Sequence, residues 1–149
     1  MARIAVQRSF DVAVSPEAAW TRLAEVERWP EWAPHIKSVV VSPTGPLGPS
    51  SAGAVQIRGF GRNSFRMSVW KPHDRWEWTG GGIPGVQIRY DHRFEAGPDD
   101  TTKMTWVVTL DGPMAWLIRP IFGRIYGRNL DRALPRLLEW MHPGHAERD

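Results

Sequence analysis

Two side chains with acid–base chemistry share one face of an apolar stretch near the middle of the chain. Over Val86–Phe94, apolar and polar residues alternate, and this period of two predicts a strand whose core side carries Tyr90 and His92. A histidine that lines a cavity exchanges protons near neutral pH, which makes His92 a candidate acid or base. The alternative is a structural histidine that is hydrogen-bonded within the core.

A third candidate is Arg8, which the alternation of the first strand places between Val6 and Phe10 on the apolar face. A buried guanidinium is costly unless it is paired. Either a bulge turns Arg8 outward, or the side chain reaches a polar ligand group or an internal carboxylate. We therefore take His92, Tyr90 and Arg8 as the candidate catalytic residues, should the protein be an enzyme.

Tryptophan is abundant, with nine residues against two tyrosines. Trp76 and Trp78 share one strand face, Trp106 lies on the inward face of a later strand, and Trp70 is out of phase with its apolar neighbours and is expected to be exposed. Broad aromatic walls with few polar groups suit a flat apolar ligand, although plain core filling explains the same pattern. The predicted ligand-binding residues are Phe65, Met67, Trp76, Trp78, Tyr90, His92, Trp106, Tyr126, Asn129, Leu130 and Leu134.

Several other kinds of site are excluded or unsupported. Because the chain has no cysteine, it has no disulfide, no thiolate zinc site and no cysteine nucleophile. It contains no metalloprotease, nucleophile-elbow, phosphate-loop or dinucleotide motif. His142 and His145 could pair on a metal, but they lie beside a proline in a polar tail, so we predict no metal and no cofactor.

Length and composition indicate a single domain over residues 1–149, with a polar tail over 142–149. Apolar residues make up 42% of the chain and charged residues 23%, as in ordinary folded domains. No apolar run approaches the roughly 20 residues of a membrane span, and the first residues turn charged too soon for a signal peptide, so a cytoplasmic location is expected. Arginine supplies 16 of the 19 basic residues, but the net charge is only +3, so no nucleic-acid partner is expected.

The elements that must position these side chains follow from periodicity and turn residues. A strand over Ile4–Val14 precedes a helix that Ser15 caps and Pro16 begins, and a second short helix is predicted over Val26–Trp32. Six further strands are predicted over Ser38–Val41, Ala54–Arg58, Ser64–Trp70, Trp76–Thr79, Gln87–Phe94 and Lys103–Leu110. Short turns rich in Gly, Pro and Asp join most of them, which predicts an antiparallel meander.

The end of the chain, Pro113–Met141, is predicted to be helical but not straight. Its apolar stripe rotates part-way along, and Pro120, Gly123 and Gly127 lie near the rotation, so we expect two amphipathic pieces with a bend there. The opposite face of the second piece carries an arginine stripe made of Arg124, Arg128, Arg132 and Arg136. We interpret this stripe as a solvated face, with an anionic membrane or partner surface as the alternative.

Three segments resemble a known family. Ser15–Trp20, Val26–Pro34 and Gly112–Ala115 ahead of a kinked final helix resemble the START/Bet v 1-like superfamily, and within it the polyketide cyclase/dehydrase-like (SRPBCC) branch with its many bacterial proteins. The resemblance covers essentially the whole chain. It implies an α+β helix-grip fold, in which a curved antiparallel sheet wraps round a long C-terminal helix and two short helices follow the first strand. It also implies an internal, mostly apolar cavity, but a fold of this kind does not settle the chemistry.

Three functions follow from these observations. The first is binding or carriage of a hydrophobic, aromatic or lipid-like small molecule in the cavity, which is favoured because few polar side chains point inward. The alternative is a polyketide cyclase or aromatase-type enzyme, whose cavity would orient a poly-β-keto chain and assist enolisation and water loss. A second alternative is a module that binds a protein or membrane surface through the arginine stripe. In each case we expect a monomer or weak homodimer without a transmembrane segment.

Overall fold

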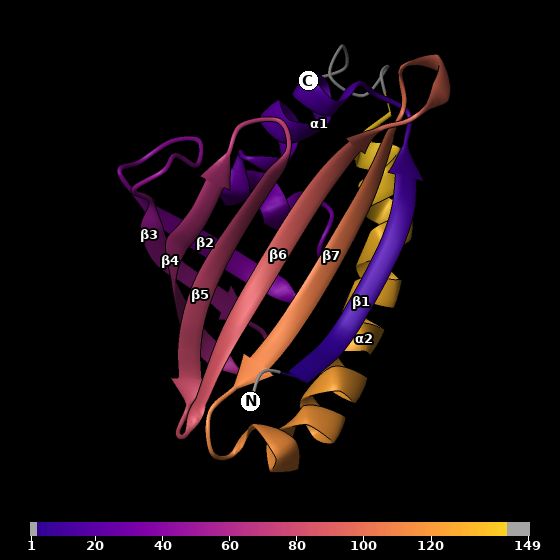
Figure 1. Cartoon of the computed structure of the whole chain (residues 1–149). Helices are drawn as coiled ribbons and strands as arrows, with labels where there is room; N and C mark the ends of the chain where they lie inside the picture. The colour runs from indigo at the N-terminus through magenta and orange to yellow at the C-terminus, as the bar shows by residue number, and fades with distance from the viewer. Residues whose placement is uncertain (1–2, 143–149) are drawn as a thin grey trace.

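Strands dominate the computed structural model, which describes residues 3–142 (Figure 1). In chain order the elements are β1 (Arg3–Val12), α1 (Pro16–Leu23), the 3₁₀ helix η1 (Val26–Glu31), β2 (Ile36–Ser42), β3 (Ala52–Ile57), β4 (Gly61–Lys71), β5 (Arg75–Ile83), β6 (Val86–Ala96), the short 3₁₀ turn η2 (Pro98–Asp100), β7 (Thr102–Asp111) and α2 (Ala115–Trp140). Every predicted strand is present, with ends that differ by a few residues.

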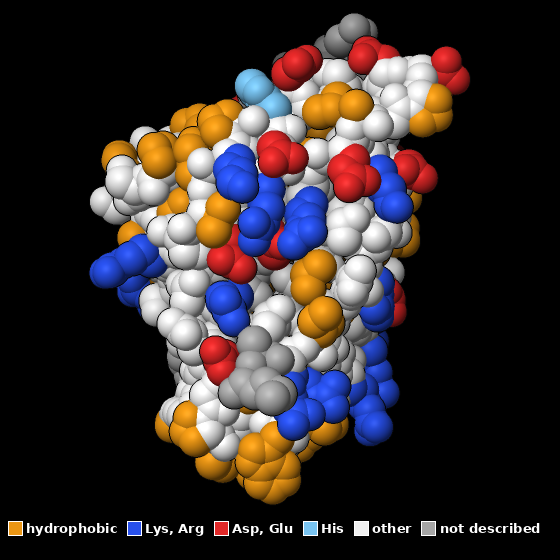
Figure 2. All heavy atoms as spheres, in the orientation of Figure 1, with side chains coloured by type: hydrophobic (Ala, Val, Ile, Leu, Met, Phe, Trp, Pro, Cys, Tyr) orange, Lys and Arg blue, Asp and Glu red, His pale blue; other side chains and the backbone are white. Residues whose placement is uncertain are grey.

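The strands form one antiparallel sheet in the order β1-β7-β6-β5-β4-β3-β2. Each strand pairs with its neighbour in the sequence except β1, which pairs with β7. The sheet curves, and α1 and α2 lie on its concave side, behind it in Figure 1. Figure 2 looks onto the convex side, where basic and acidic side chains mingle over the middle strands. The predicted α+β arrangement of a curved sheet around a long last helix is therefore confirmed.

Local sequence signals account for the two short helices between β1 and β2. The Ser15 hydroxyl oxygen accepts a hydrogen bond from the backbone N–H of Ala18 at 3.2 Å, and Pro16 occupies the first turn. The second helix is a 3₁₀ helix over Val26–Glu31 with Pro30 inside it, and the backbone N–H of Trp32 still donates to the Trp29 carbonyl at 3.1 Å.

The last helix is one continuous element from Ala115 to Trp140, so no break divides the two predicted amphipathic pieces. Pro120 lies inside it without ending it. In Figure 1 the ribbon changes direction over its first turns and then runs along β1. A Cβ atom at Gly123 would lie 2.7 Å from the carbonyl oxygen of Ala5, so this glycine allows the helix to approach β1 closely.

A bulge in β4 reverses the side-chain phase near the end of that strand. The β4–β5 register shifts between Met67 and Val69, so Trp70 turns to the concave face. There Trp70 is half-buried, and its ring centroid lies 4.9 Å from that of Trp20 and 6.4 Å from that of Trp76. The prediction of an exposed Trp70 is wrong because strict alternation makes no allowance for a bulge.

Candidate functional site

The concave face of β6 divides the interior into two parts. Toward the start of the strand, Ile88 and Tyr90 line a cavity, whereas His92 and Phe94 belong to a packed aromatic cluster further along. All four lie on one face because alternate side chains of a strand point the same way. The boundary therefore falls between two of the predicted site residues.

The aromatic cluster fills the interior beneath α1 and η1. The His92 ring centroid lies 4.9 Å from that of Trp76, 5.2 Å from that of Trp78 and 5.7 Å from that of Trp106. Trp29 reaches it from η1 at 6.1 Å. All four indoles are buried, and none of these rings lines the cavity. Within the described residues, these tryptophans belong to the hydrophobic core. The expectation that they form the walls of the cavity is therefore wrong.

His92 points inward as predicted, but it lies away from the cavity. Burial lowers the pKa of His92 to about 4, and its Nδ1 atom has no hydrogen-bond partner within residues 3–142. An imidazole with this pKa is neutral at pH 7 and is poorly matched to proton transfer there. The placement supports a structural role for His92 rather than a catalytic one.

The cavity lies between the start of β6, the end of β5, the β3–β4 turn and the first half of α2, and its volume is about 310 Å³. This volume is at the lower end of the roughly 300–1,000 Å³ typical of small-molecule sites. Most of the lining is apolar. The lining residues are Ile57, Phe60, Asn63, Ile83, Ile88, Tyr90, Ile118, Ile121, Phe122, Ile125, Tyr126 and Asn129.

Polar groups in the cavity are few: two tyrosine hydroxyls and two amides. The Tyr90 and Tyr126 ring centroids lie 5.8 Å apart, and Phe122 stacks on Tyr126 at 5.4 Å. Burial raises the pKa of both tyrosines above the ordinary value, so both hydroxyls stay protonated. The Asn63 amide donates to a carbonyl of its own turn. Within the described chain, the hydroxyls and the Asn129 amide have no side-chain hydrogen bond, so they are available to a ligand.

The predicted ligand-binding residues are therefore divided between the two parts of the interior. Three of them line the cavity: Tyr90, Tyr126 and Asn129. The rest pack in the core or against it: Phe65, Met67, Trp76, Trp78, His92, Trp106, Leu130 and Leu134. A period of two identifies the face that a side chain occupies, but not whether the space in front of it is already filled.

Most of the apolar lining is not among the predicted residues. Ile118, Ile121 and Ile125 share one helical face in the sequence, and this stripe is rotated away from the one that follows it. The rotation is the available signal, because two such stripes cannot cover the same surface. Phe60 gives no such signal, since it lies in a glycine-rich turn.

Arg8 lies on the concave side of β1, yet it does not line the cavity. Its Nε donates to the Asp131 carboxylate of α2 at 2.8 Å, and Nη2 donates to the second oxygen at 3.3 Å. This hydrogen bond raises the pKa of Arg8 and lowers that of Asp131. A carboxylate partner was one of the two predicted alternatives, but it comes from an exposed position on α2, so Arg8 joins β1 to α2 instead of serving a ligand.

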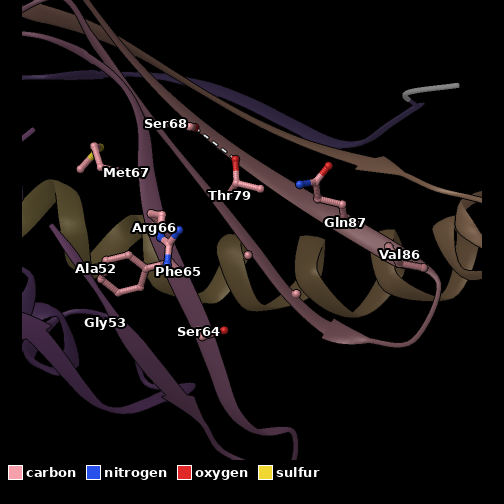
Figure 3. A pocket seen from close by; sticks show the side chains of 12 residues that line it. Ala52, Gly53, Ser64, Phe65, Arg66, Met67, Ser68, Thr79, Val86 and Gln87 are labelled. Carbon is pink, nitrogen blue, oxygen red and sulfur yellow. Dashed lines mark hydrogen bonds between the residues drawn. The ribbon is translucent and has the colours of Figure 1, made fainter. Parts of the chain in front are cut away.

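A wider depression of about 720 Å³ lies on the convex face (Figure 3). Its lining comes from β3, β4, β5 and β6 and includes the exposed Ser64, Arg66 and Gln87. Ser68 and Thr79 are joined there by a hydrogen bond of 3.1 Å. The depression is open and partly polar, so the smaller, mostly apolar cavity is the better candidate for a ligand site.

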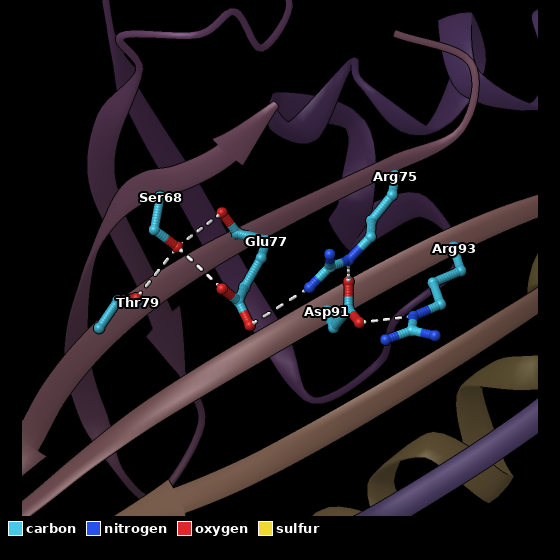
Figure 4. A network of polar contacts seen from close by, with 6 residues as sticks. All are labelled: Ser68, Arg75, Glu77, Thr79, Asp91 and Arg93. Atoms are coloured by element: carbon cyan, nitrogen blue, oxygen red, sulfur yellow. Dashed lines mark hydrogen bonds and ion pairs between the residues drawn. The ribbon is translucent and has the colours of Figure 1, made fainter. Parts of the chain in front are cut away.

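Charged side chains on the convex face form a closed network (Figure 4). The buried carboxylate of Asp91 accepts hydrogen bonds from Arg75 Nε at 2.8 Å and from Arg93 Nε at 2.7 Å. Arg75 also lies 4.0 Å from Glu77, whose carboxylate accepts a hydrogen bond from Ser68. Because each charge is already paired, the network braces neighbouring strands and offers no free acid or base.

Metal ligands are not grouped in the described part of the chain. No cluster of three or more His, Asp or Glu side chains suited to a metal ion occurs among residues 3–142. His142 is exposed, whereas His145 lies outside the described residues, so the geometry of that pair is not defined.

Comparison with sequences gives one family and a distant relative. Residues 3–139 match the family model described as polyketide cyclase/dehydrase and lipid transport. An uncharacterised protein of Mycobacterium tuberculosis (strain ATCC 25618 / H37Rv) is 26% identical over 137 residues, which cover 85% of this chain and 81% of the relative.

Solved structures share the fold at low sequence identity. A START superfamily protein from Mycobacterium smegmatis has a TM-score of 0.67 and 16% identity, over 93% of this chain and 97% of its own. The Zhui aromatase/cyclase from Streptomyces sp. R1128 has a TM-score of 0.67 and 15% identity, over 99% of this chain and 95% of its own. The architecture is the helix-grip fold of the START and Bet v 1 relatives. By the family match, the chain belongs to the polyketide cyclase/dehydrase and lipid transport family.

Proposed function

We propose that the protein binds a compact, mostly apolar small molecule in the cavity beside α2. The observation that carries the proposal is an apolar lining around two half-buried tyrosines whose hydroxyls have no hydrogen-bond partner in the described chain. Removal of an apolar ring from water supplies affinity, at roughly 25 cal/mol per Å² of buried area. The few polar groups then fix the orientation of the ligand.

The chemistry of the polar groups suggests the kind of ligand. A tyrosine that stays protonated donates a hydrogen bond, so Tyr90 and Tyr126 suit a carbonyl or phenol oxygen. The Asn129 amide both donates and accepts. The stacked pair of Phe122 and Tyr126 offers a flat surface, which favours an aromatic ligand. An aromatic ketone, quinone or phenol fulfils all of these conditions.

Binding without turnover is favoured over polyketide cyclisation. The lining contains no His, Asp, Glu, Lys or Arg, and its two tyrosines have raised pKa values. No lining group is therefore suited to proton transfer near neutral pH. Orientation of a flexible poly-β-keto chain is the contribution that such a cavity could still make to a cyclase, so turnover is measured alongside binding.

The first test compares two probes that differ by one hydroxyl, 2-naphthol and naphthalene, by calorimetric titration. Wild type is expected to bind each at one site. Tyr126→Phe should weaken the binding of 2-naphthol by about 2- to 10-fold, the cost of one hydrogen bond, and leave the binding of naphthalene unchanged. Tyr90→Phe provides the same comparison for the second hydroxyl.

A matched pair of helix variants tests the position of the ligand. Ile125→Phe adds volume inside the cavity and should abolish binding, whereas Leu138→Phe adds similar volume at an exposed position of the same helix and should bind like wild type. Thermal unfolding verifies that both variants fold. The proposal is wrong if neither probe saturates the protein, or if Ile125→Phe binds both probes normally. Turnover of an aromatic polyketide surrogate that Tyr126→Phe abolishes would establish the cyclase alternative instead.

A further inference from the structure

Large apolar side chains are exposed where the cavity meets the surface. Phe60 is 58% exposed and Ile121 is 63% exposed, although both line the cavity, so the cavity opens between the β3–β4 turn and α2. Further large apolar side chains are exposed at the N-cap and in the first turns of α2, and we call the whole set the apolar rim: Phe60, Met114, Trp116, Leu117 and Ile121. Figure 2 shows hydrophobic side chains gathered at the lower end of the molecule, where α2 begins in Figure 1.

The charge around the apolar rim is mostly positive, and the acidic side chain nearest to it in the sequence, Asp111, is paired with Arg89 at 3.8 Å. Four arginines flank its members in the sequence: Arg58, Arg62, Arg119 and Arg124. The segments that contribute the cavity lining, residues 57–63, 83–90 and 118–129, contain no Asp or Glu. Within the described chain, the arginines at 58, 62 and 124 form no ion pair. This end of the molecule therefore presents uncompensated positive charge beside exposed apolar surface.

We propose that the apolar rim docks on an anionic lipid bilayer, so that the cavity opens into the membrane interface. Exposed Trp, Leu and Phe side chains enter the boundary between headgroups and acyl chains, while arginines beside them remain at the lipid phosphates. Each arginine near such a surface contributes roughly fivefold in affinity. The proposal rests on the proposed function in one respect, because the bilayer is the source or destination of the ligand.

The structure also suggests how a ligand would transfer. Phe60 and Ile121 belong both to the cavity lining and to the apolar rim, so the apolar surface is continuous from the interior to the docked face. A hydrophobic molecule that leaves the bilayer through this opening stays in contact with apolar groups throughout. The contact removes the cost of exposing the molecule to water during transfer.

A second copy of the chain fits the apolar rim less well than a bilayer. Self-association would bring two arginine-flanked rims together, which like charges oppose. An acidic protein would satisfy the charge, but the rim comes from two separate elements around a hollow, and a fluid bilayer adapts to such a shape. In residues 3–142, no helix is both long and apolar enough to cross a membrane.

The test is flotation of the full-length protein with vesicles of phosphatidylcholine, alone or mixed with phosphatidylglycerol. Wild type should bind the anionic vesicles at low salt, bind the neutral ones far more weakly, and be released by high salt. Arg62→Gln combined with Arg124→Gln should weaken binding by about 30-fold, and Trp116→Ser combined with Leu117→Ser by about 10-fold or more. Arg136→Gln and Leu138→Ser, exposed on the same helix beyond the rim, should bind like wild type.

Failure of this proposal can be separated from failure of the proposed function. None of the substituted residues lines the cavity, so all variants should bind 2-naphthol normally. Vesicle binding without 2-naphthol binding overturns the function alone, and the reverse result overturns the docking alone. Docking is also overturned if neutral and anionic vesicles bind equally, or if Trp116→Ser with Leu117→Ser has no effect. A dimer that sedimentation detects in wild type and that this variant dissolves would assign the rim to a second copy.

Discussion

Tyr90 and His92 lie two residues apart on one face of β6, and only Tyr90 contacts the cavity. The alternation of the strand predicts correctly that both point inward. The two side chains differ in what packs against them. Trp29 of η1 packs on His92, whereas Tyr90 faces the open cavity. That difference arises from a residue far away in the sequence, so periodicity cannot show it.

The burial of His92 makes a prediction about acid stability. The unfolded chain takes up a proton on this imidazole below about pH 6.5, whereas the folded protein resists protonation until about pH 4. The unfolded state therefore binds more protons over this range, and stability falls as the pH falls. We expect His92 alone to contribute a loss of about 2 kcal/mol between pH 7 and pH 5.

Urea denaturation of wild type and His92→Gln at both pH values measures this loss. The variant should be less stable at pH 7, because it disturbs the packed rings, but its stability should depend less on pH. His35→Gln is the comparison variant. Burial also lowers the pKa of His35 to about 4, although this side chain is less buried than that of His92. Equal pH dependence in wild type and His92→Gln would contradict the prediction.

At the scale of the element, α2 shows why proline and glycine did not divide the helix. Gly123 allows close contact with the backbone of β1, and the Arg8–Asp131 pair joins the same two elements about two helical turns further on. Tertiary packing thus holds together a segment whose local propensity is poor. Proline and glycine favour a helix break locally, but the contacts of α2 with β1 outweigh them. These contacts cannot be read from the sequence.

Two alanine substitutions in α2 separate close approach from helix propensity. Gly123→Ala would place a Cβ atom 2.7 Å from the Ala5 carbonyl oxygen, so the helix must move, and we expect a loss of about 1–3 kcal/mol. At Gly127 the nearest atom, 3.0 Å away, is the end of the flexible Arg8 side chain. Gly127→Ala should therefore be neutral or stabilise by up to about 1 kcal/mol. Chemical denaturation measures the free energy of unfolding of the two variants. Equal changes in both would refute the interpretation that Gly123 is needed for close approach to β1.

At the scale of the whole molecule, the cavity and the aromatic cluster lie at opposite ends of the concave face. A ligand in the cavity contacts α2, the end of β5 and the start of β6, while β2 and η1 lie outside its reach. Binding stabilises the folded state by mass action, by about 2.7 kcal/mol at a ligand concentration of one hundred times Kd. Local openings should be suppressed most where the ligand makes its contacts.

Hydrogen exchange with and without 2-naphthol tests this division. Amides of the first half of α2 and of the β5–β6 turn should exchange more slowly with the ligand, and those of η1 and β2 should change least. Ile125→Phe, which fills the cavity, should show no ligand effect in any segment. Protection centred on Trp76 and Trp106 would instead place the ligand in the aromatic cluster.

The meander was predictable because its signals are local. Short turns such as Gly97–Thr101 connect strands that pair with their immediate neighbours, and each strand carries its own alternation. The pairing of β1 with β7 has no local signal, and it was not predicted. A mostly apolar internal cavity was predicted, but its position was not. The position depends on which side chains from distant elements fill the rest of the interior.

The pairing of β1 with β7 has a consequence for biosynthesis. Val12 lies opposite Thr102, so the first strand leaves the ribosome ninety residues ahead of the strand that receives it. At about 5–20 residues per second, that interval lasts roughly 5–20 s. Throughout it, the N-terminal strand of the nascent chain has no sheet to join, and α2, which packs on the same strand, emerges later still. Closure of the sheet is therefore a late step of synthesis, and a chain that stops before β7 leaves its first strand without a partner.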